Sequence, residues 1–322
     1  MTTAETVDTP RLGLPAVDVA KPDPDDTLYW SVTSIIGVLD RPALMYWAAE
    51  QTAVAALSSQ ATWQGMIADC DDACRHDNAR DCQAVKWLRD ARFRRPRNVL
   101  SASETGTVVH ALAENYALTG VRPDRDQVAH EITTVGASTV DLERELPVVT
   151  AMLDQFDGWL QRATPSYQAT EVAVFSPTFG YAGTADAFLT VGGVRFIADY
   201  KTTRDPTDSK GKAKTPFPEV ALQLAAYRHA DLAAVWRPRR TEKMRRRYYA
   251  LSPAEHALGV PVPEVDAGLV IHITPEHCEA YPVRCDETVH RSFLFVQEAA
   301  RWSFEQSQHV IGDPLEYDGK EA

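Results

Sequence analysis

The chain has 322 residues and a formal net charge of −12 at pH 7, with 44% hydrophobic and 24% charged residues. These proportions are typical of a globular protein, and no apolar run approaches the roughly 20 residues of a membrane-spanning helix, which argues against a membrane protein. The length favours one core of about 200 residues with an N-terminal helical elaboration over two equal domains. Five cysteines, an odd number, and no signal peptide lead us to expect a reducing cytoplasm.

The N-terminal third combines a polar leader, a predicted helix and a basic cluster. Residues 1–27, rich in Thr, Asp and Pro, are expected to form a flexible leader, and a helix is predicted over 41–57. Cys70, Cys74 and Cys82 follow at a spacing looser than zinc or iron–sulfur sites usually show, so free thiols are the default expectation. The basic cluster that comes next includes Arg92, Arg94, Arg95 and Arg97. It is expected either to bind phosphate groups or to form a solvated surface.

A helix is predicted over 104–119, where Ser101 and Glu104 have the spacing of a capping box. His110 and Glu114 lie four residues apart and therefore share one face of this helix. They are candidates for a metal ligand and its supporting carboxylate. A surface pair or a core histidine explains the same spacing. A further helix is predicted over 141–162.

The strongest chemical signal lies on three predicted strands, over 170–175, 183–191 and 194–201. Gly192 and Gly193 predict a tight hairpin between the second and third, so Asp186 and Asp199 should face each other across neighbouring arms. Such a carboxylate pair suits Mg²⁺ or Mn²⁺, with the Tyr200 carbonyl as an extra ligand. Lys201 points to the same side as Asp199 because strand side chains alternate. A turn cap and an exposed ion pair are the simpler alternative.

The last third adds a helix, a second basic cluster and more strands. Gln223 and Tyr227 share one face of a helix predicted over 217–235, where they could donate to a phosphate or only close the edge of a core. Strands are then predicted over 246–251, 268–274 and 278–284, and a final helix over 286–307. The second basic cluster includes Arg239, Arg240, Arg245, Arg246 and Arg247 and is a second candidate for phosphate binding.

The order of these motifs resembles that of a known enzyme family. The motifs are, in chain order, His110, Gly183 to Asp186, Asp199 to Thr202 and Gln223 to Tyr227. They are similar to the motifs of the PD-(D/E)xK nuclease superfamily, specifically its RecB-like exonuclease branch, which includes CRISPR-associated and phage exonucleases. The resemblance implies an α/β fold with a restriction-endonuclease-like core, in which helices flank a central mixed β-sheet. The expected division is a leader over 1–27, a helical lobe over 28–100, a nuclease core over 101–310 and a tail over 311–322.

The resemblance also implies a reaction and roles for the residues. The metal ligands would be His110, Asp186, Asp199 and the Tyr200 carbonyl, and Lys201 would orient or help deprotonate the attacking water. Gln223 and Tyr227 would position the phosphate or nearby waters, and Glu114 would support a ligand. The expected enzyme is a metal-dependent exonuclease of single- or double-stranded linear DNA, leaving a 5′-phosphate and a 3′-hydroxyl.

The expected setting is phage or bacterial recombination and repair in the cytoplasm, where a recombination protein could be a partner. Two other functions fit the same motifs: a non-catalytic nucleic-acid-binding accessory protein and a structure-specific endonuclease. Many RecB-like relatives hold an iron–sulfur cluster with one cysteine before the core and three after it. Here only Cys278 and Cys285 follow the core, so such a cluster is not expected.

Overall fold

The computed structural model describes residues 24–39, 42–70, 74, 82–93, 99–136, 140–207, 211–234, 239–243 and 246–314. They form two compact units. The first unit comprises the described residues up to Leu39, residues 109–123 and the chain from Val149 onward; the second comprises the described residues of 40–108 and 124–148. The long helices α5 (Ala102–Thr119) and α7 (Leu142–Ala163) each contribute to both units.

The first unit is built on a mixed sheet of ten strands in the described part of the chain. The strands are β1 (Thr27–Ser31), β2 (Ser166–Ser176), β3 (Tyr181–Val191), β4 (Val194–Thr202), β5 (Leu232–Ala233), β6 (Arg239–Lys243), β7 (Arg246–Leu251), β8 (Val260–Pro261), β9 (Ala267–Ile273) and β10 (Cys278–Val283). Their order is β10-β9-β4-β3-β1-β7-β6, with β2 on the other edge of β3. The pairs β4–β9 and β1–β3 are parallel and the other pairs antiparallel, which confirms the predicted mixed sheet.

Strand β3 changes partner along one of its edges. It pairs with β2 along one edge, whereas on the other edge Tyr181 and Ala182 pair with β1, and residues 187–191 pair with β4. Between these pairings, residues 183–186 have no strand partner on that edge within the described part of the chain. The sheet therefore forks at the segment that carries Asp186.

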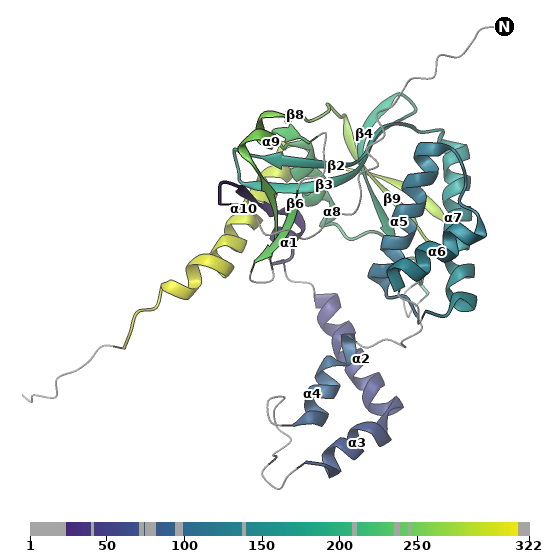
Figure 1. Ribbon diagram of the computed structural model, residues 1–322, viewed down its shortest axis with the longest axis vertical. Helices are drawn as coiled ribbons and strands as arrows, with labels where there is room; N and C mark the ends of the chain where they lie inside the picture. Colours follow the sequence, from purple (N-terminus) through teal and green to yellow (C-terminus); the bar gives the residue numbers. More distant parts are fainter. Residues whose placement is uncertain are drawn as a thin grey trace, which may run out of the picture. The chain divides into compact units, whose positions relative to one another are not determined.

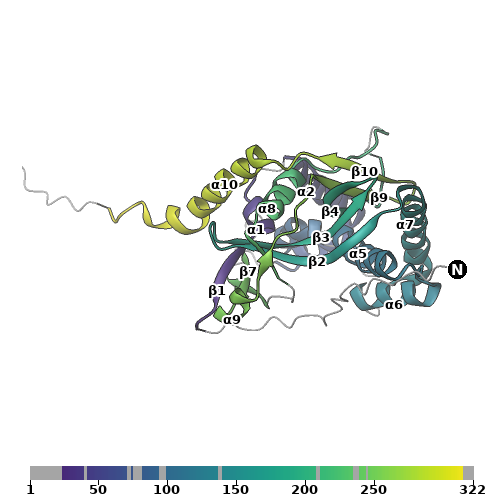
Figure 2. The same cartoon turned by 90° about the horizontal axis from the view of Figure 1, so that it is seen from above.

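Three helices pack together on one face of the sheet: α1 (Val32–Ile36), α8 (Val220–Arg228) and α10 (Glu287–Arg301). Figure 2 shows α8 and α10 along the strands, and their apolar side chains join those of β2, β3 and β4 in one buried cluster. The shorter α9 (Pro253–Ala257) begins with a capping box at Ser252. Helix α8 is shorter than the predicted 217–235, because residues 232–233 pair with β2 as β5.

The predicted start of α5 is confirmed by a reciprocal cap. The Ser101 backbone N–H donates to Glu104 Oε2 over 2.9 Å, and the Glu104 N–H donates to Ser101 Oγ over 3.2 Å. Because the cap fixes where the helix begins, it also fixes which residues share the face of His110. No helix among the described residues is both long and apolar enough to cross a bilayer.

The second unit is helical. Helices α2 (Pro42–Ser58), α3 (Gln60–Ala68) and α4 (Gln83–Arg89) contact one another, and a 3₁₀ turn over Asp90–Phe93 follows (Figure 1). Helix α6 (Arg125–Gly136) also belongs to this unit. Residues up to Leu39 group with the sheet, so the division differs from the predicted lobe over 28–100. Most of the predicted leader and tail lies outside the described residues.

Candidate active site

Three carboxylates form a row across β2, β3 and β4. The pairing of Ala187 with Ala198 places Asp186 opposite Asp199 when the register is extended by one residue. The pairings of β2 with β3 on either side of Glu171 place Glu171 opposite Asp186. Residues opposite each other in antiparallel strands project to the same face, so Asp186 lies beside Asp199, and Glu171 occupies the neighbouring position of β2. The turn at Gly192 and Gly193, with φ values of 57° and 84°, sets this register.

Asp199 is the most enclosed of the three. It is only 2% exposed, and its Oδ1 accepts a hydrogen bond from Gln223 Nε2 over 2.8 Å. Its Oδ2 lies 2.5 Å from Lys201 Nζ but accepts no well-directed hydrogen bond. A buried carboxylate oxygen without a directed donor is costly unless a cation compensates it. Lys201 supplies part of that charge from a side chain that is 40% exposed.

Asp186 is held by the backbone of the neighbouring strand. Its Oδ2 accepts a hydrogen bond from the Tyr200 N–H over 2.8 Å. Burial, and then the negative charge of Asp199, raise the pKa of Asp186 to about 8, against the opposing effects of Lys201 and the Tyr200 N–H. Without a bound cation, one proton therefore stays in this cluster at neutral pH.

His110 joins the cluster from α5. Its Nε2 lies 2.8 Å from the Tyr200 carbonyl oxygen, which can only accept, so Nε2 carries the proton and donates. Burial lowers the pKa of His110, so the ring is neutral at pH 7 and Nδ1 keeps its lone pair. That nitrogen lies 3.7 Å from Asp186 Oδ2. A lone pair beside a carboxylate oxygen suits a shared cation.

Glu171 was not predicted as a site residue. It is partly buried, and its negative charge acts on His110. Its φ of 50° is in the left-handed region, which a non-glycine residue adopts at a cost of about 1–3 kcal/mol and most often at functional sites. The neighbouring Thr170 hydroxyl donates to Glu114 Oε1 over 2.8 Å. Glu114 thus fixes the strand beside Glu171, a supporting role.

Tyr227 does not lie where a phosphate could reach it. It is 2% exposed, and its hydroxyl accepts from Gln223 Nε2 over 3.3 Å. Burial raises the pKa of Tyr227 well above its usual range. A Cβ added at Gly183 would lie 2.2 Å from Tyr227 Cε1, so glycine there lets the tyrosine ring pack against β3. Tyr227 therefore positions Gln223, which in turn orients Asp199.

The chemistry of this cluster fits a divalent cation. Asp199 Oδ2 lacks a directed donor. Burial and then Asp199 raise the pKa of Asp186, and the Tyr200 carbonyl oxygen keeps a second lone pair. Carboxylate and carbonyl oxygen donors are typical of Mg²⁺ and Mn²⁺ sites. A cation would offset the negative charge that these carboxylates bring together.

The two basic clusters are only partly described. Arg94, Arg95, Arg97 and Arg245, together with the side chains of Arg92 and Arg246, lie outside the described residues. Arg240 is exposed, donates to Thr184 Oγ1 over 2.9 Å and lies over the Tyr249 ring. Thr184 and Asp186 share one face of β3, so Arg240 flanks the carboxylates. Arg247 is also exposed.

Arg239 does not fit the predicted role in phosphate binding. Its guanidinium donates to Asp26 Oδ1 over 2.7 Å and approaches Glu255 Oε2 at 3.5 Å. The Asp26 side chain is only 1% exposed, so Arg239 compensates the charge of an enclosed carboxylate. This arginine ties β6 to the start of β1 instead of facing a ligand.

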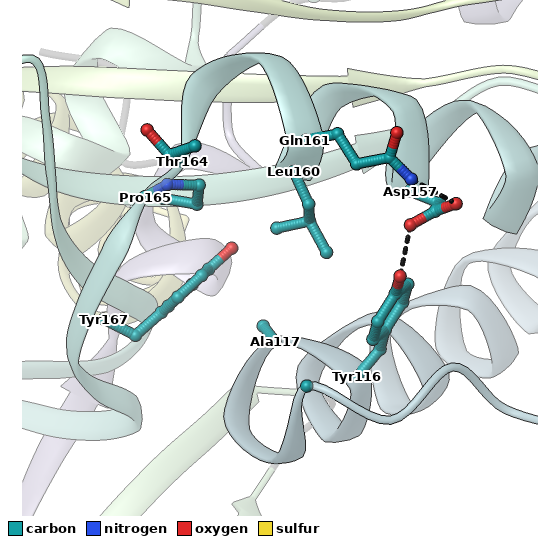
Figure 3. Close-up of a pocket in the computed structure, with 9 residues that line it drawn as sticks. Tyr116, Ala117, Asp157, Leu160, Gln161, Thr164, Pro165 and Tyr167 are labelled. Atoms are coloured by element: carbon teal, nitrogen blue, oxygen red, sulfur yellow. Dashed lines mark hydrogen bonds between the residues drawn. The ribbon is translucent and has the colours of Figure 1, made fainter. Parts of the chain in front are cut away.

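A separate pocket of about 370 Å³ lies between the ends of α5 and α7 (Figure 3). Within it the Tyr116 hydroxyl and Gln161 Nε2 both donate to Asp157, which leaves that carboxylate satisfied. Tyr167 also lines the pocket, and its hydroxyl lies 2.8 Å from that of Tyr200. None of the three carboxylates of the row lines this pocket, so it is distinct from the candidate site.

Similarity to known proteins was found among solved structures and family models. A solved structure described as "Crystal structure of SSO0001" is similar to the chain with 17% identity and a TM-score of 0.26, over 61% of this chain and 84% of the other. No curated protein matched the chain. The family model described as the PD-(D/E)XK nuclease superfamily matches residues 75–303. That match includes His110, all three carboxylates and Lys201 and covers more than half of the chain, and the chain therefore belongs to the PD-(D/E)XK nuclease superfamily.

Proposed function

We propose that this nuclease is a metal-dependent exonuclease of linear DNA that leaves a 5′-phosphate and a 3′-hydroxyl. The observation that carries the proposal is the cluster of Asp186, Asp199 and Lys201 at the fork of the sheet, with His110 beside it. The order of the motifs along the chain, which is similar to that of RecB-like exonucleases, supports action on DNA ends. A cytoplasmic role in phage or bacterial recombination and repair, with a recombination protein as partner, is part of the proposal.

The metal would be Mg²⁺ or Mn²⁺, held by Asp186, Asp199, His110 and the Tyr200 carbonyl. Glu171 extends this set, because the β2–β3 register places it opposite Asp186. When bound, such a cation lowers the pKa of a water molecule and neutralises charge on the phosphoryl oxygens. The protein contributes a rigid arrangement, since three strands and one capped helix fix the donors.

Lys201 is the residue best placed to act on the attacking water. Its ammonium lies 2.5 Å from Asp199 Oδ2, and a 40% exposed side chain can contact a substrate phosphate and water together. An ammonium has three donors and rotates freely, so it can hold a water while remaining paired with a carboxylate. Gln223 holds the other oxygen of Asp199 and so keeps that carboxylate in one orientation.

A time course on end-labelled DNA tests the proposal. Single- and double-stranded linear DNA, labelled at the 5′ or the 3′ end, and a covalently closed circle would each be incubated with enzyme and Mg²⁺. We expect linear DNA to be degraded from an end while the closed circle stays intact, with 5′-phosphates on the products. A folded protein that binds DNA but cuts none of it would point to an accessory protein. Equal cutting of the closed circle would point to an endonuclease.

Glu171→Gln is expected to lower the rate of cleavage about tenfold, since it removes one charge from the cation site but keeps the shape of the side chain. Activity should recover in part at higher Mn²⁺ concentration, measured by titrating the metal at fixed DNA. Glu264→Gln is the control, because Glu264 contacts only the exposed Arg195 among the described interactions. Equal rates for Glu171→Gln and wild type at all metal concentrations would exclude Glu171 from the site.

Arg240→Gln is expected to weaken DNA binding and to lower the salt dependence of the binding constant by roughly 0.9 in log–log slope, as loss of one phosphate contact does. The rate at saturating DNA should change little. Fluorescence anisotropy at several salt concentrations measures the slope. Arg195→Gln is the matched control, since Arg195 already donates to Asp266. An unchanged slope for Arg240→Gln would remove this arginine from the DNA path.

A further inference from the structure

Three cysteine side chains converge in the second unit, and none of them belongs to a nuclease motif. Cys70 follows the end of α3, Cys82 is the N-cap residue of α4, and Cys74 lies between them in the sequence. Their sulfur atoms all lie within 4.8 Å of one another. Cys82 is buried and the other two are partly buried. Cys70 and Cys74 precede the part of the chain that the family model matches.

The spacing of the sulfurs fits one tetrahedral ion. A Zn–S bond of about 2.3 Å places the sulfurs of a tetrahedral site roughly 3.8 Å apart, inside the observed range. Cysteines that bind an iron–sulfur cubane lie further apart, because each of them binds a different iron atom. Three thiols so close together, with no sulfur bonded to another, are compatible with the spacing of a single-ion site. A zinc ion with three thiolates has room for a fourth ligand.

The helices that carry the thiols bury little apolar surface. Helix α3 has no buried residue, while Met45, Tyr46, Val54 and Leu57 of α2 are exposed. Small helical units with so little core commonly depend on a metal, since the free energy of metal binding becomes free energy of folding. An ion held by Cys70, Cys74 and Cys82 would join the end of α3 to the start of α4.

We propose that Cys70, Cys74 and Cys82 bind one structural Zn²⁺ that holds α3 and α4 together, independently of the nuclease cation. The site takes its thiols from one contiguous stretch before the nuclease motifs. Thiolate sulfur selects zinc over Mg²⁺ and Mn²⁺, which prefer oxygen, so the two sites would be loaded by different metals.

Metal analysis of the full chain tests the proposal. Protein expressed with added zinc and dialysed against a metal-free buffer is expected to retain about one Zn²⁺ per chain, as a structural site does. Cobalt substitution should give an intense thiolate-to-Co²⁺ absorption. Cys70→Ser with Cys74→Ser should lose the zinc and the absorption, whereas Cys278→Ser, which changes a buried cysteine in β10, should keep both. Asp199→Asn should also retain zinc, so the result does not depend on nuclease activity.

Limited proteolysis gives a second measurement. Removal of zinc is expected to expose cleavage sites within residues 42–93 while the sheet unit stays resistant. The reason is that only the helical unit would lose the ion that joins α3 to α4. Several outcomes would overturn the proposal. They are a wild type without stoichiometric zinc, zinc retained by the double variant, a purified protein with equimolar iron and sulfide, and unchanged proteolysis after zinc removal.

Discussion

Asp199→Asn and Lys201→Met are each expected to lower the rate of DNA cleavage by roughly 10²–10⁴-fold, the range typical of groups that act on the proton of an attacking water. Asp199 is 2% exposed and contacts Lys201 Nζ and Gln223 Nε2, so its charge orients both side chains. Loss of the lysine removes the ammonium that would hold the water but leaves Asp199 oriented by Gln223. DNA binding should survive in both variants, measured by anisotropy without Mg²⁺.

Matched substitutions away from the carboxylate row distinguish this loss from misfolding. Asp266→Asn changes a carboxylate that is paired with Arg195, and Lys214→Met changes an exposed lysine. Both control variants should cleave at the wild-type rate. If Lys201→Met cleaved at the wild-type rate while folding normally, Lys201 would have no role in the reaction, and the proposed mechanism would be wrong.

The centre of the site could be predicted from sequence because it depends on local rules. A two-glycine turn fixes the register of β3 and β4, so the spacing from Gly192 and Gly193 alone places Asp186 across from Asp199. The capping box at Ser101 likewise fixes the phase of α5 and with it the face that carries His110. In both cases the deciding contacts lie within a few residues of the motif.

What the sequence did not predict depends on contacts between distant segments. Glu171 lies in a strand that carries no recognisable motif, and only the pairing of β2 with β3 places it opposite Asp186. Arg239 resembles its basic neighbours, but a pairing across 213 residues with Asp26 gives it a structural role. Strand β1 lies close to the polar leader and was not predicted, since its partners β3 and β7 are far along the chain.

The fork in the sheet explains why the site lies at Gly183 to Asp186. One edge of this segment faces the gap between β1 and β4, and its backbone groups have no strand partner there within the described structure. Side chains and backbone groups of three strands can therefore converge at this edge. Gly183 keeps the segment close to α8, because any Cβ would collide with Tyr227. Helix α8 can therefore bring Gln223 to Asp199, while α5 brings His110 to Tyr200.

Metal binding by this cluster is expected to depend steeply on pH, because Asp186 must lose a proton to become a ligand. Its pKa of about 8 is above the unfolded value of 3.8, owing to burial and to Asp199. The raised pKa of this carboxyl group contributes to the stability of the metal-free fold. The contribution is complete below pH 4 and is lost as the pH rises through 8. The affinity for Mn²⁺ should therefore increase about tenfold per pH unit between pH 6.5 and 8, with release of one proton.

Calorimetric titration of Mn²⁺ in two buffers of different ionisation enthalpy measures that proton directly. His110 contributes little over this range, because burial lowers its pKa and the ring is already neutral. Asp186→Asn should bind Mn²⁺ weakly at every pH and release no proton. The stability of its metal-free form should no longer fall with rising pH through ionisation of residue 186. A wild-type affinity independent of pH would mean that Asp186 is already ionised in the metal-free protein.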